Sequence, residues 1–194
     1  AMAMAGMAIV GRQKFGVFPL KGKILNVKDG SNAKKLLENA EISSIKKALG
    51  LQSGRVYKTL DELRYGKVLV LSDQDEDGTH IKGLVFNLFH SLWPSLYNTP
   101  GFLNSMLTPV IKAKKGKQVV QFYSVKDYDK WKQSHLGFSI KYYKGLGTST
   151  PQEAREYFKE FKNVKYLTND DENNAAIELA FSKNEDSANN RKIM

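Results

Sequence analysis

Residues 67–78 constrain the fold of this chain more than any other segment. The apolar run Lys-Val-Leu-Val-Leu at 67–71 is typical of a buried strand, and Asp73, Asp75 and Asp77 follow it at alternate positions before Gly78. A helical pattern begins directly after the glycine. Ionised carboxylates this close repel one another, so the cluster requires a cation nearby. Oxygen ligands in a chain without cysteine favour Mg²⁺ over Zn²⁺.

Other known patterns share parts of this spacing. An EF-hand loop would need a glutamate at its twelfth position, which is Leu84, and a helix in front of the loop, so it is excluded. Phosphatases of the haloacid dehalogenase type have Thr or Val at the position of Asp77. They also have an acidic pair at the end of a strand further along the chain. Here the pair Asp170-Asp171 lies in a polar, Asn-rich stretch. The Toprim metal site of topoisomerases and primases fits the strand, the turn and the helix, and a solvated acidic turn is the simpler alternative.

The charge of the chain indicates a polyanionic partner. Its formal net charge is +10, and residues 12–67 carry 13 lysines and arginines against five acidic residues. A basic half beside a local acidic cluster favours nucleic acid held next to a metal site, and a generic basic surface is the alternative. The absence of cysteine excludes disulfides and thiolate metal sites. No run reaches the roughly 20 apolar residues of a membrane helix, so no membrane partner is expected.

Hydrophobic periodicity predicts helices that alternate with strands. Helices are expected at 1–10, 33–49 (capped by Ser31), 79–97, 125–133, 151–158 and 175–181, and strands at 67–71, 102–113, 118–123 and 138–143. The helix at 79–97 should bury an apolar face that includes Leu88 and Phe89, and Pro94 should kink or end it. One of Tyr142 and Tyr143 should be in the core, and residues 163–174 are expected to be irregular. The alternation implies an α/β domain with a mainly parallel sheet, and the metal cluster would lie at the carboxyl end of a strand.

Several longer motifs carry a family resemblance. They are Phe-Gly-Val-Phe-Pro-Leu-Lys-Gly-Lys-Ile-Leu-Asn-Val at 15–27, Asn-Ala-Glu-Ile at 39–42, Leu-Arg-Tyr-Gly at 63–66, Asp-Gln-Asp-Glu-Asp-Gly-Thr-His-Ile-Lys-Gly-Leu at 73–84, Lys-Tyr-Tyr-Lys-Gly-Leu-Gly-Thr at 141–148 and Ala-Phe-Ser-Lys at 180–183. In this order the motifs closely resemble the type IIA DNA topoisomerases. Trp-Pro-Ser-Leu at 93–96 and Gly-Thr-Ser at 147–149 resemble the eukaryotic enzymes more than bacterial gyrase.

The resemblance implies a Toprim fold, a Rossmann-like α/β arrangement with a mainly parallel sheet flanked by helices. Residues 1–162 would form the Toprim domain without its first, glutamate-containing strand. Residues 163–194 would be a polar segment with short helices that leads toward an absent winged-helix domain. The family's Glu-Gly-Asp-Ser segment, its ATPase portion and its nucleophilic tyrosine have no counterpart here, and neither Tyr142 nor Tyr143 matches the nucleophile. The chain alone is therefore expected to be an inactive fragment.

The resemblance also implies the site residues. Asp73 and Asp75 would be the catalytic residues and main metal ligands, and Asp77 a weaker ligand. The cofactor would be Mg²⁺, for which Mn²⁺ or Ca²⁺ may substitute, and the parent enzyme would also use ATP. The residues expected to bind or line the DNA are Lys21, Gly22, Lys23, Asn26, Glu41 and Lys144.

The expected function is that of an ATP-dependent isomerase that cleaves and religates duplex DNA for strand passage. Its partners would be double-stranded DNA and the remaining domains of the same enzyme, a nuclear homodimer. A Mg²⁺-dependent phosphatase or nuclease and a non-catalytic basic DNA-binding module stay open as alternatives. The phosphatase would turn over a small phosphate ester by itself. The binding module would bind DNA with a metal dependence that Asp73→Ala and Asp75→Ala leave unchanged.

Overall fold

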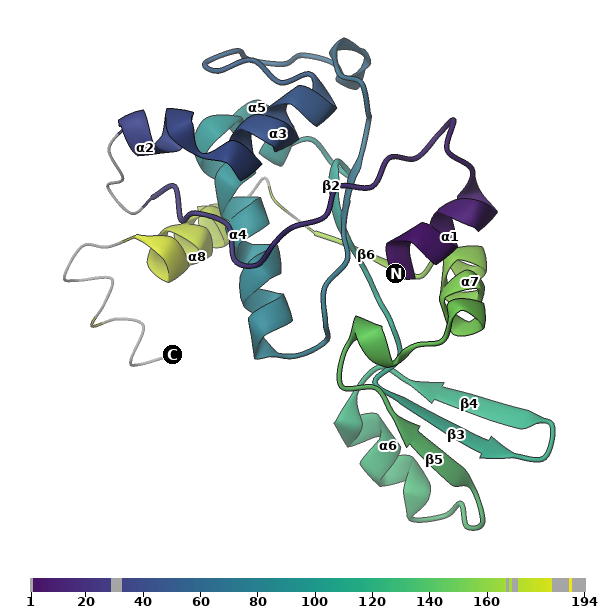
Figure 1. The fold of residues 1–194 in the computed structure, drawn as a ribbon. Helices are drawn as coiled ribbons and strands as arrows, with labels where there is room; N and C mark the ends of the chain where they lie inside the picture. The colour runs from purple at the N-terminus through teal and green to yellow at the C-terminus, as the bar shows by residue number, and fades with distance from the viewer. Residues whose placement is uncertain (1, 29–32, 167, 169–170, 183–188, 190–194) are drawn as a thin grey trace. The chain divides into compact units, whose positions relative to one another are not determined.

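The chain forms two compact units, each assembled from separate stretches of sequence. The computed structural model describes residues 2–28, 33–166, 168, 171–182 and 189 (Figure 1). The first unit comprises Ala1–Val17, Leu71–Thr79 and Met106–Val164. The second unit comprises Phe18–Val70, His80–Ser105 and Lys165–Met194.

An antiparallel sheet in the order β4-β3-β5 forms one part of the first unit. Its strands are β3 (Ile111–Lys115), β4 (Gln118–Phe122) and β5 (Ser139–Tyr142). Helix α6 (Val125–Lys132) packs on this sheet (Figure 1). A small core forms between them from Ile111, Ala113, Phe122 and Tyr128.

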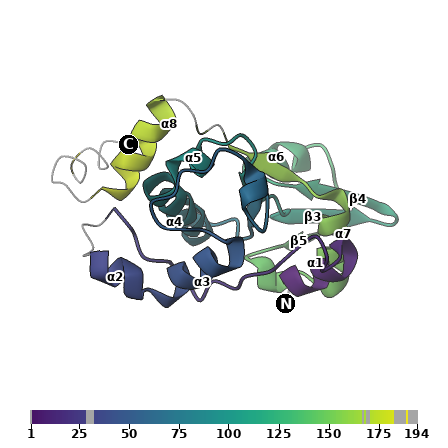
Figure 2. The ribbon, with the colours of Figure 1, turned by 90° about the horizontal axis from the view of Figure 1, so that it is seen from above.

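The other part of the first unit contains α1 (Met2–Val10), the short 3₁₀ turn η2 (Leu146–Thr148) and α7 (Pro151–Glu160). Helices α1 and α7 lie side by side in both ribbon views (Figures 1 and 2). They approach so closely that a Cβ on Gly6 would lie 2.2 Å from the ring of Phe158. Glycine at this position therefore permits the contact.

The second unit is built around a long central helix. Its elements include α2 (Ala33–Glu38), α3 (Ala40–Leu49), η1 (Leu60–Glu62), α5 (Pro94–Tyr97) and α8 (Asp171–Phe181), together with α4 (Glu76–Leu92), whose residues through Thr79 belong to the first unit. The face of α4 expected to be apolar is buried, with Leu88 and Phe89 both fully covered. The Phe89 ring meets that of Phe102 edge-on at 5.3 Å, and Trp93 donates its indole N–H to the Gln52 carbonyl at 2.8 Å.

A second sheet has the strand order β1-β2-β6, with β1 (Val68–Val70), β2 (Leu103–Met106) and β6 (Asn163–Lys165). Strands β1 and β2 run parallel, with Val68 opposite Leu103. Because the other sheet is antiparallel, the expected mainly parallel sheet is not confirmed, although α/β content is. The reason lies at residues 116–117, since this two-residue turn between β3 and β4 permits only antiparallel pairing.

Element boundaries differ from the sequence prediction where one side chain ends an element. Asn39 divides the expected helix at 33–49 because its side chain caps α3 by accepting the Ile42 N–H at 2.9 Å. Pro109 lies between β2 and β3, which the prediction had joined. At Pro94, where a kink or an end of the helix was expected, α5 starts after α4 has ended.

Toward the carboxyl end the expected irregular stretch at 163–174 contains β6, and α8 starts four residues earlier than the expected helix. Ser31, the predicted cap, lies outside the described residues. In the described part of the chain, no helix is both long and apolar enough to cross a membrane.

Candidate metal and nucleic-acid site

The predicted ligand Asp73 lies in the segment between β1 and α4. Its side chain is half-buried, and its Oδ1 accepts a hydrogen bond of 2.6 Å from the backbone N–H of Leu146. Leu146 belongs to the Gly-Leu-Gly segment at 145–147, which lies far along the chain. The first unit thus brings together two motifs that the sequence analysis had treated separately.

Two glycines lie against Asp73. A Cβ on Gly78 would lie 2.0 Å from the Asp73 carbonyl oxygen, so only glycine lets the first turn of α4 approach this backbone. A Cβ on Gly145 would lie 2.7 Å from Oδ2 of the Asp73 carboxylate. The helix was expected to begin after Gly78, but α4 begins at Glu76, so Gly78 lies inside the helix and not in a turn before it. The close approach to Asp73 is the physical reason for a glycine there.

Asp75 caps α4. Its Oδ1 accepts the Gly78 N–H at 2.7 Å, and its carbonyl oxygen accepts the Thr79 hydroxyl at 2.9 Å. Glu76 and Asp77 occupy the first turn of the same helix, where the positive end of the helix dipole stabilises carboxylates. These acidic side chains therefore help to start α4, a role that the sequence analysis did not assign to them.

In the second unit, the predicted DNA-binding residues begin on an exposed loop. Lys21, Gly22 and Lys23 are exposed, and Gly22 has a φ of +144°, a value that favours glycine. The backbone N–H of Lys21 donates to the Glu41 carboxylate at 3.0 Å. Glu41 therefore ties the lysine loop to the first turn of α3.

The predicted DNA contact Asn26 is engaged inside the second unit. Its side-chain amide donates to the Phe181 carbonyl at 2.8 Å, at the end of α8. Its Oδ1 accepts the Asn87 side-chain amide at 2.9 Å and the Lys28 N–H at 3.1 Å. Asn26 thus joins α4, α8 and its own segment through hydrogen bonds.

Lys144 is exposed in the first unit, directly before Gly145. Of the two tyrosines before Lys144, Tyr143 is in the core with 9% of its surface exposed, whereas Tyr142 is 57% exposed. The prediction that one of them is buried is confirmed.

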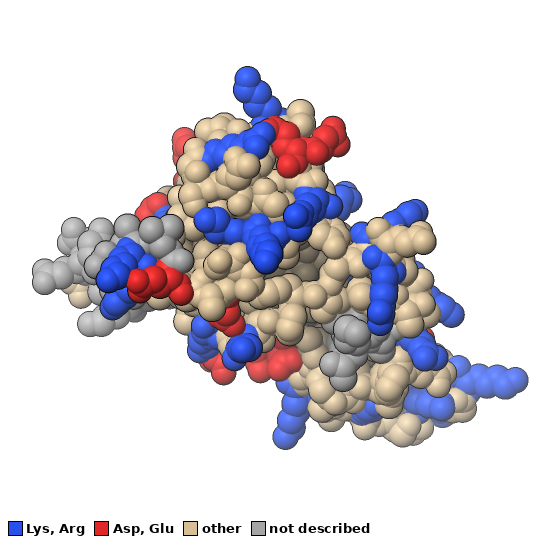
Figure 3. All heavy atoms as spheres, turned by 45° about the horizontal axis from the view of Figure 1, so that its top comes forward, with Lys and Arg blue, Asp and Glu red and all other residues tan. Residues whose placement is uncertain are grey.

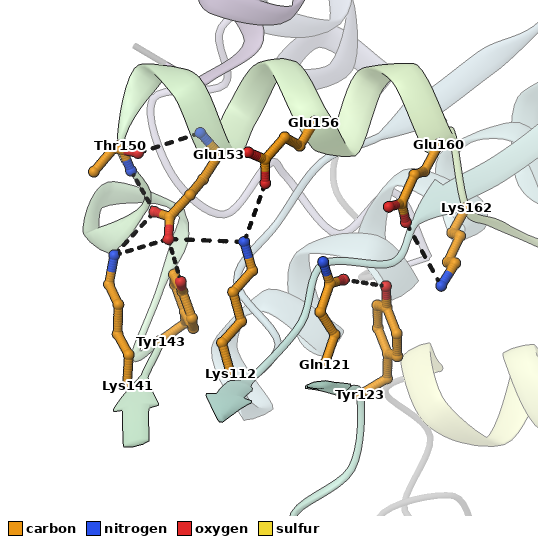
Figure 4. A network of polar contacts seen from close by, with 10 residues as sticks. All are labelled: Lys112, Gln121, Tyr123, Lys141, Tyr143, Thr150, Glu153, Glu156, Glu160 and Lys162. Carbon is orange, nitrogen blue, oxygen red and sulfur yellow. Dashed lines mark hydrogen bonds and ion pairs between the residues drawn. The ribbon is translucent and has the colours of Figure 1, made fainter. Parts of the chain in front are cut away.

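A polar network around Glu153 was not anticipated (Figure 4). Glu153 extends from α7 and accepts hydrogen bonds from the Tyr143 hydroxyl and from Lys141 Nζ at 2.9 Å. The buried Lys112 lies 3.7 Å from Glu153 and 3.5 Å from Glu156. The network therefore connects α7 to strands β3 and β5.

The network shifts the titration of its members. Burial alone would raise the pKa of the Glu153 carboxyl, but hydrogen bonds, first from Tyr143 and then from Thr150 and Lys141, lower it to about 2. Burial, and then the bond to Glu153, raise the pKa of Tyr143. The carboxylate and the neutral phenol are thus the stable forms near neutral pH.

A sequence signal for Glu153 existed. Thr150-Pro151-Gln152-Glu153 is a capping box, in which the Thr150 side chain accepts the Glu153 N–H and the Glu153 carboxylate accepts the Thr150 N–H. The helix expected at 151–158 begins within this pattern, but the role of Glu153 in the pattern was not anticipated. The hydrogen bond from Leu146 to Asp73 had no comparable signal, since it joins distant segments.

Basic side chains are distributed widely over the surface. In Figure 3, lysine and arginine are spread over the visible face and outnumber acidic residues there. This agrees with the formal charge of +10 and with a polyanionic partner.

Comparison with known proteins identifies the family. A family model for the Toprim domain matches residues 1–103, and a model for the C-terminal associated domain of TOPRIM matches residues 106–194. The chain is 50% identical to DNA topoisomerase 2 of Pisum sativum over 200 residues and 49% identical to DNA topoisomerase 2-beta of Gallus gallus over 191 residues. The chain belongs to the Toprim family, and these relatives at about 50% identity are eukaryotic DNA topoisomerase 2 proteins. The alignments cover 100% and 94% of this chain but only 14% and 12% of those relatives.

A solved structure supports the same assignment. The DNA-binding, cleavage and re-ligation domain of Plasmodium falciparum topoisomerase II superposes with a TM-score of 0.92 at 42% identity, covering 99% of this chain and 26% of that chain. The Toprim fold is therefore shown. The boundary between the two family models falls at residues 103–106, whereas the boundary expected at 162–163 stays a prediction.

Toprim domains of type II topoisomerases use divalent metal ions, so the donor set of this chain can be compared with that requirement. Asp73 and Asp75 offer hard carboxylate oxygens of the kind that Mg²⁺ prefers. Each uses one oxygen to accept a backbone N–H. Within the described ranges, no group of three or more His, Cys, Asp or Glu residues could hold a metal ion. The carboxylate oxygens are therefore the type of ligand that a hard cation binds. Water or further ligands would have to complete the coordination shell of the ion.

Proposed function

We propose that this chain is the metal-binding part of an ATP-dependent type II DNA topoisomerase that cleaves and religates duplex DNA for strand passage. Asp73 and Asp75 would hold Mg²⁺, with Asp77 as a weaker ligand. The observation that carries the proposal is the fixed position of the Asp73 carboxylate, which a backbone N–H from a second family motif holds at 2.6 Å. A divalent cation held by these residues would supply Lewis-acid stabilisation of charge that develops on a phosphodiester.

The remaining residues would bind and orient DNA. Lys21 and Lys23 would contact phosphates from an exposed loop, and Gly22 would let the backbone approach the duplex. Glu41 would hold this loop, and Lys144 would add a phosphate contact from the first unit. Asn26 would act close to the DNA, through the segment that its hydrogen bonds anchor. The parent enzyme would be a nuclear homodimer that hydrolyses ATP in another domain.

Metal binding by the chain itself can be tested with Mn²⁺, whose unpaired electrons broaden the NMR signals of nearby amides. Mn²⁺ should broaden amides at residues 73–78, and Asp73→Asn should remove most of this broadening because it removes a charged ligand. Asp127→Asn is the control, since Asp127 is an exposed aspartate in the first turn of α6 and lies outside residues 73–78. Equal broadening in wild type and Asp73→Asn would overturn the metal assignment.

The link to catalysis needs the complete enzyme that contains this segment. There, Asp73→Asn and Asp75→Asn should each abolish formation of the cleaved, protein-linked DNA, whereas Asp127→Asn should leave it unchanged. Normal cleavage by both site variants would contradict the proposed role of the aspartates. Turnover of a small phosphate ester by the isolated chain would instead support the phosphatase alternative.

A further inference from the structure

The Gly-Leu-Gly segment meets Asp73 through two separate features of its backbone. The first is the Leu146 N–H, which donates to Oδ1 of Asp73 at 2.6 Å. The second is the absence of a side chain on Gly145, where a Cβ would lie 2.7 Å from Oδ2, 2.9 Å from Cγ and 3.0 Å from Oδ1 of Asp73. One residue thus holds the carboxylate, and its neighbour leaves room for it.

Space, and not backbone conformation, explains the glycine at position 145. Gly145 has a φ of −173° and a ψ of 175°, an extended conformation that any residue adopts. Gly147, two residues further on, has no heavy atom within 4 Å of the position of a Cβ. The two glycines therefore differ in whether a methyl group would displace Asp73.

Hydrogen bonds hold the turn at both of its ends. The Gly145 carbonyl accepts the Thr148 hydroxyl at 2.6 Å and the Thr148 N–H at 3.1 Å. Glu153 binds the Tyr143 hydroxyl before the turn and the Thr150 N–H, at 2.8 Å, after it. The network drawn in Figure 4 thus fixes the segment at 143–150 that carries the Leu146 N–H.

We propose that Gly145 and Leu146 position the Asp73 carboxylate for a divalent cation, with Gly145 required because a larger residue would rotate that carboxylate. The inference rests on the proposed function, in which Asp73 is a metal ligand. A hydrogen bond from a backbone N–H to a carboxylate is charge-assisted and fixes the orientation of the carboxylate. Because Oδ1 accepts this hydrogen bond, Oδ2 would be the oxygen of Asp73 that holds a cation.

A methyl group at position 145 should alter the site more than the fold. The clashing atoms belong to the end of a short side chain, so rotation of Asp73 relieves the contact without moving the backbone. Loss of a partner that orients a metal ligand typically weakens metal affinity about 10- to 100-fold. Gly145→Ala should therefore bind Mn²⁺ at least about tenfold more weakly, whereas Gly147→Ala should match wild type.

The experiment titrates Mn²⁺ into wild type, Gly145→Ala, Gly147→Ala and Asp73→Asn while NMR signals at residues 73–78 are recorded. Equal Mn²⁺ affinity in Gly145→Ala and Gly147→Ala would overturn the inference if Asp73→Asn binds more weakly. Unchanged affinity in Asp73→Asn would instead overturn the proposed function itself. The two failures are therefore distinguishable.

A second measurement does not depend on whether Gly145→Ala folds. Hydrogen exchange of the Leu146 amide should be at least about tenfold faster in Asp73→Asn than in wild type, because the neutral amide is a weaker acceptor than the carboxylate. Asp127→Asn should leave this rate unchanged. An equal Leu146 exchange rate in Asp73→Asn and wild type would overturn the positioning role.

Discussion

The two regions proposed to act on DNA hold their charged groups in different ways. In the first unit, the Asp73 carboxylate is bonded to a turn that Glu153 ties down at both ends. In the second unit, Lys21 and Lys23 are exposed on a loop that a hydrogen bond from the Lys21 backbone N–H joins to Glu41. The difference follows from the ligands, because a metal ion needs oxygens at fixed positions whereas long lysine side chains reach phosphates from many conformations.

Asn26 does not follow this division. The sequence placed it with the DNA-contacting lysines, but its side chain is engaged with Phe181, Asn87 and Lys28. It resembles the fixed groups of the first unit more than the exposed lysines. Three predictions sharpen or break the comparison between held and exposed groups.

The largest effect is expected for Asn26→Ala. Loss of this amide removes the hydrogen bonds that Asn26 makes to the Phe181 carbonyl and to the Asn87 side-chain amide, which should lower the free energy of unfolding by about 2 kcal/mol. Urea unfolding of the chain measures the change. Asn98→Ala is the control, because Asn98 is an exposed amide at the end of α5.

DNA binding by Asn26→Ala distinguishes the two roles of this residue. Under conditions where the variant is folded, the salt dependence of duplex binding should equal that of wild type, since a neutral amide releases no counterion. Unchanged stability together with weaker DNA binding would place Asn26 with the lysines and would break the comparison.

A smaller effect is expected for Glu153→Gln and depends on pH. The pKa of Glu153 is lowered to about 2 from an ordinary value of 4.5, so its contribution to stability is fully present above about pH 4.5 and is lost as the pH falls toward 2. This contribution is about 1–2 kcal/mol after allowance for solvent screening. Wild type should therefore lose stability over this interval more steeply than Glu153→Gln.

Urea unfolding at several pH values between 2 and 6 tests the prediction for Glu153. Glu156→Gln is the matched control, because Glu156 also approaches Lys112 but has a side chain that is 47% exposed. Parallel pH profiles for wild type and Glu153→Gln would show that the network does not hold the turn as described.

The smallest effect is expected for Lys23→Ala. Removal of one phosphate contact should weaken duplex binding a few-fold and reduce the slope of log affinity against log salt by about 0.9. Fluorescence anisotropy with duplex DNA over a range of salt concentrations measures both. Lys58→Ala is the control at another exposed lysine of the second unit, and identical slopes for wild type and Lys23→Ala would remove Lys23 from the proposed interface.

Local patterns in the sequence were sufficient to predict most elements. The apolar spacing along α4 correctly predicted that Leu88 and Phe89 are buried, and alternation along β5 correctly predicted one buried tyrosine. Boundaries failed where a single side chain ended an element, as Asn39 does before α3. The mainly parallel sheet was inferred from the alternation of helices and strands. That inference did not take into account the short turn at 116–117, which permits only antiparallel pairing of β3 with β4.

The sequence by itself determined the chemistry of this protein: the carboxylates after β1, the basic loop around Gly22 and the family to which the motifs belong. Only the tertiary structure decided which groups meet. It placed the Leu146 N–H on Asp73, turned Asn26 toward Phe181 and made Glu153 the centre of a network. The physical reason is that residue type and spacing specify donors, acceptors and periodicity along the chain, whereas contacts between distant segments depend on how the packed elements bring their backbones together.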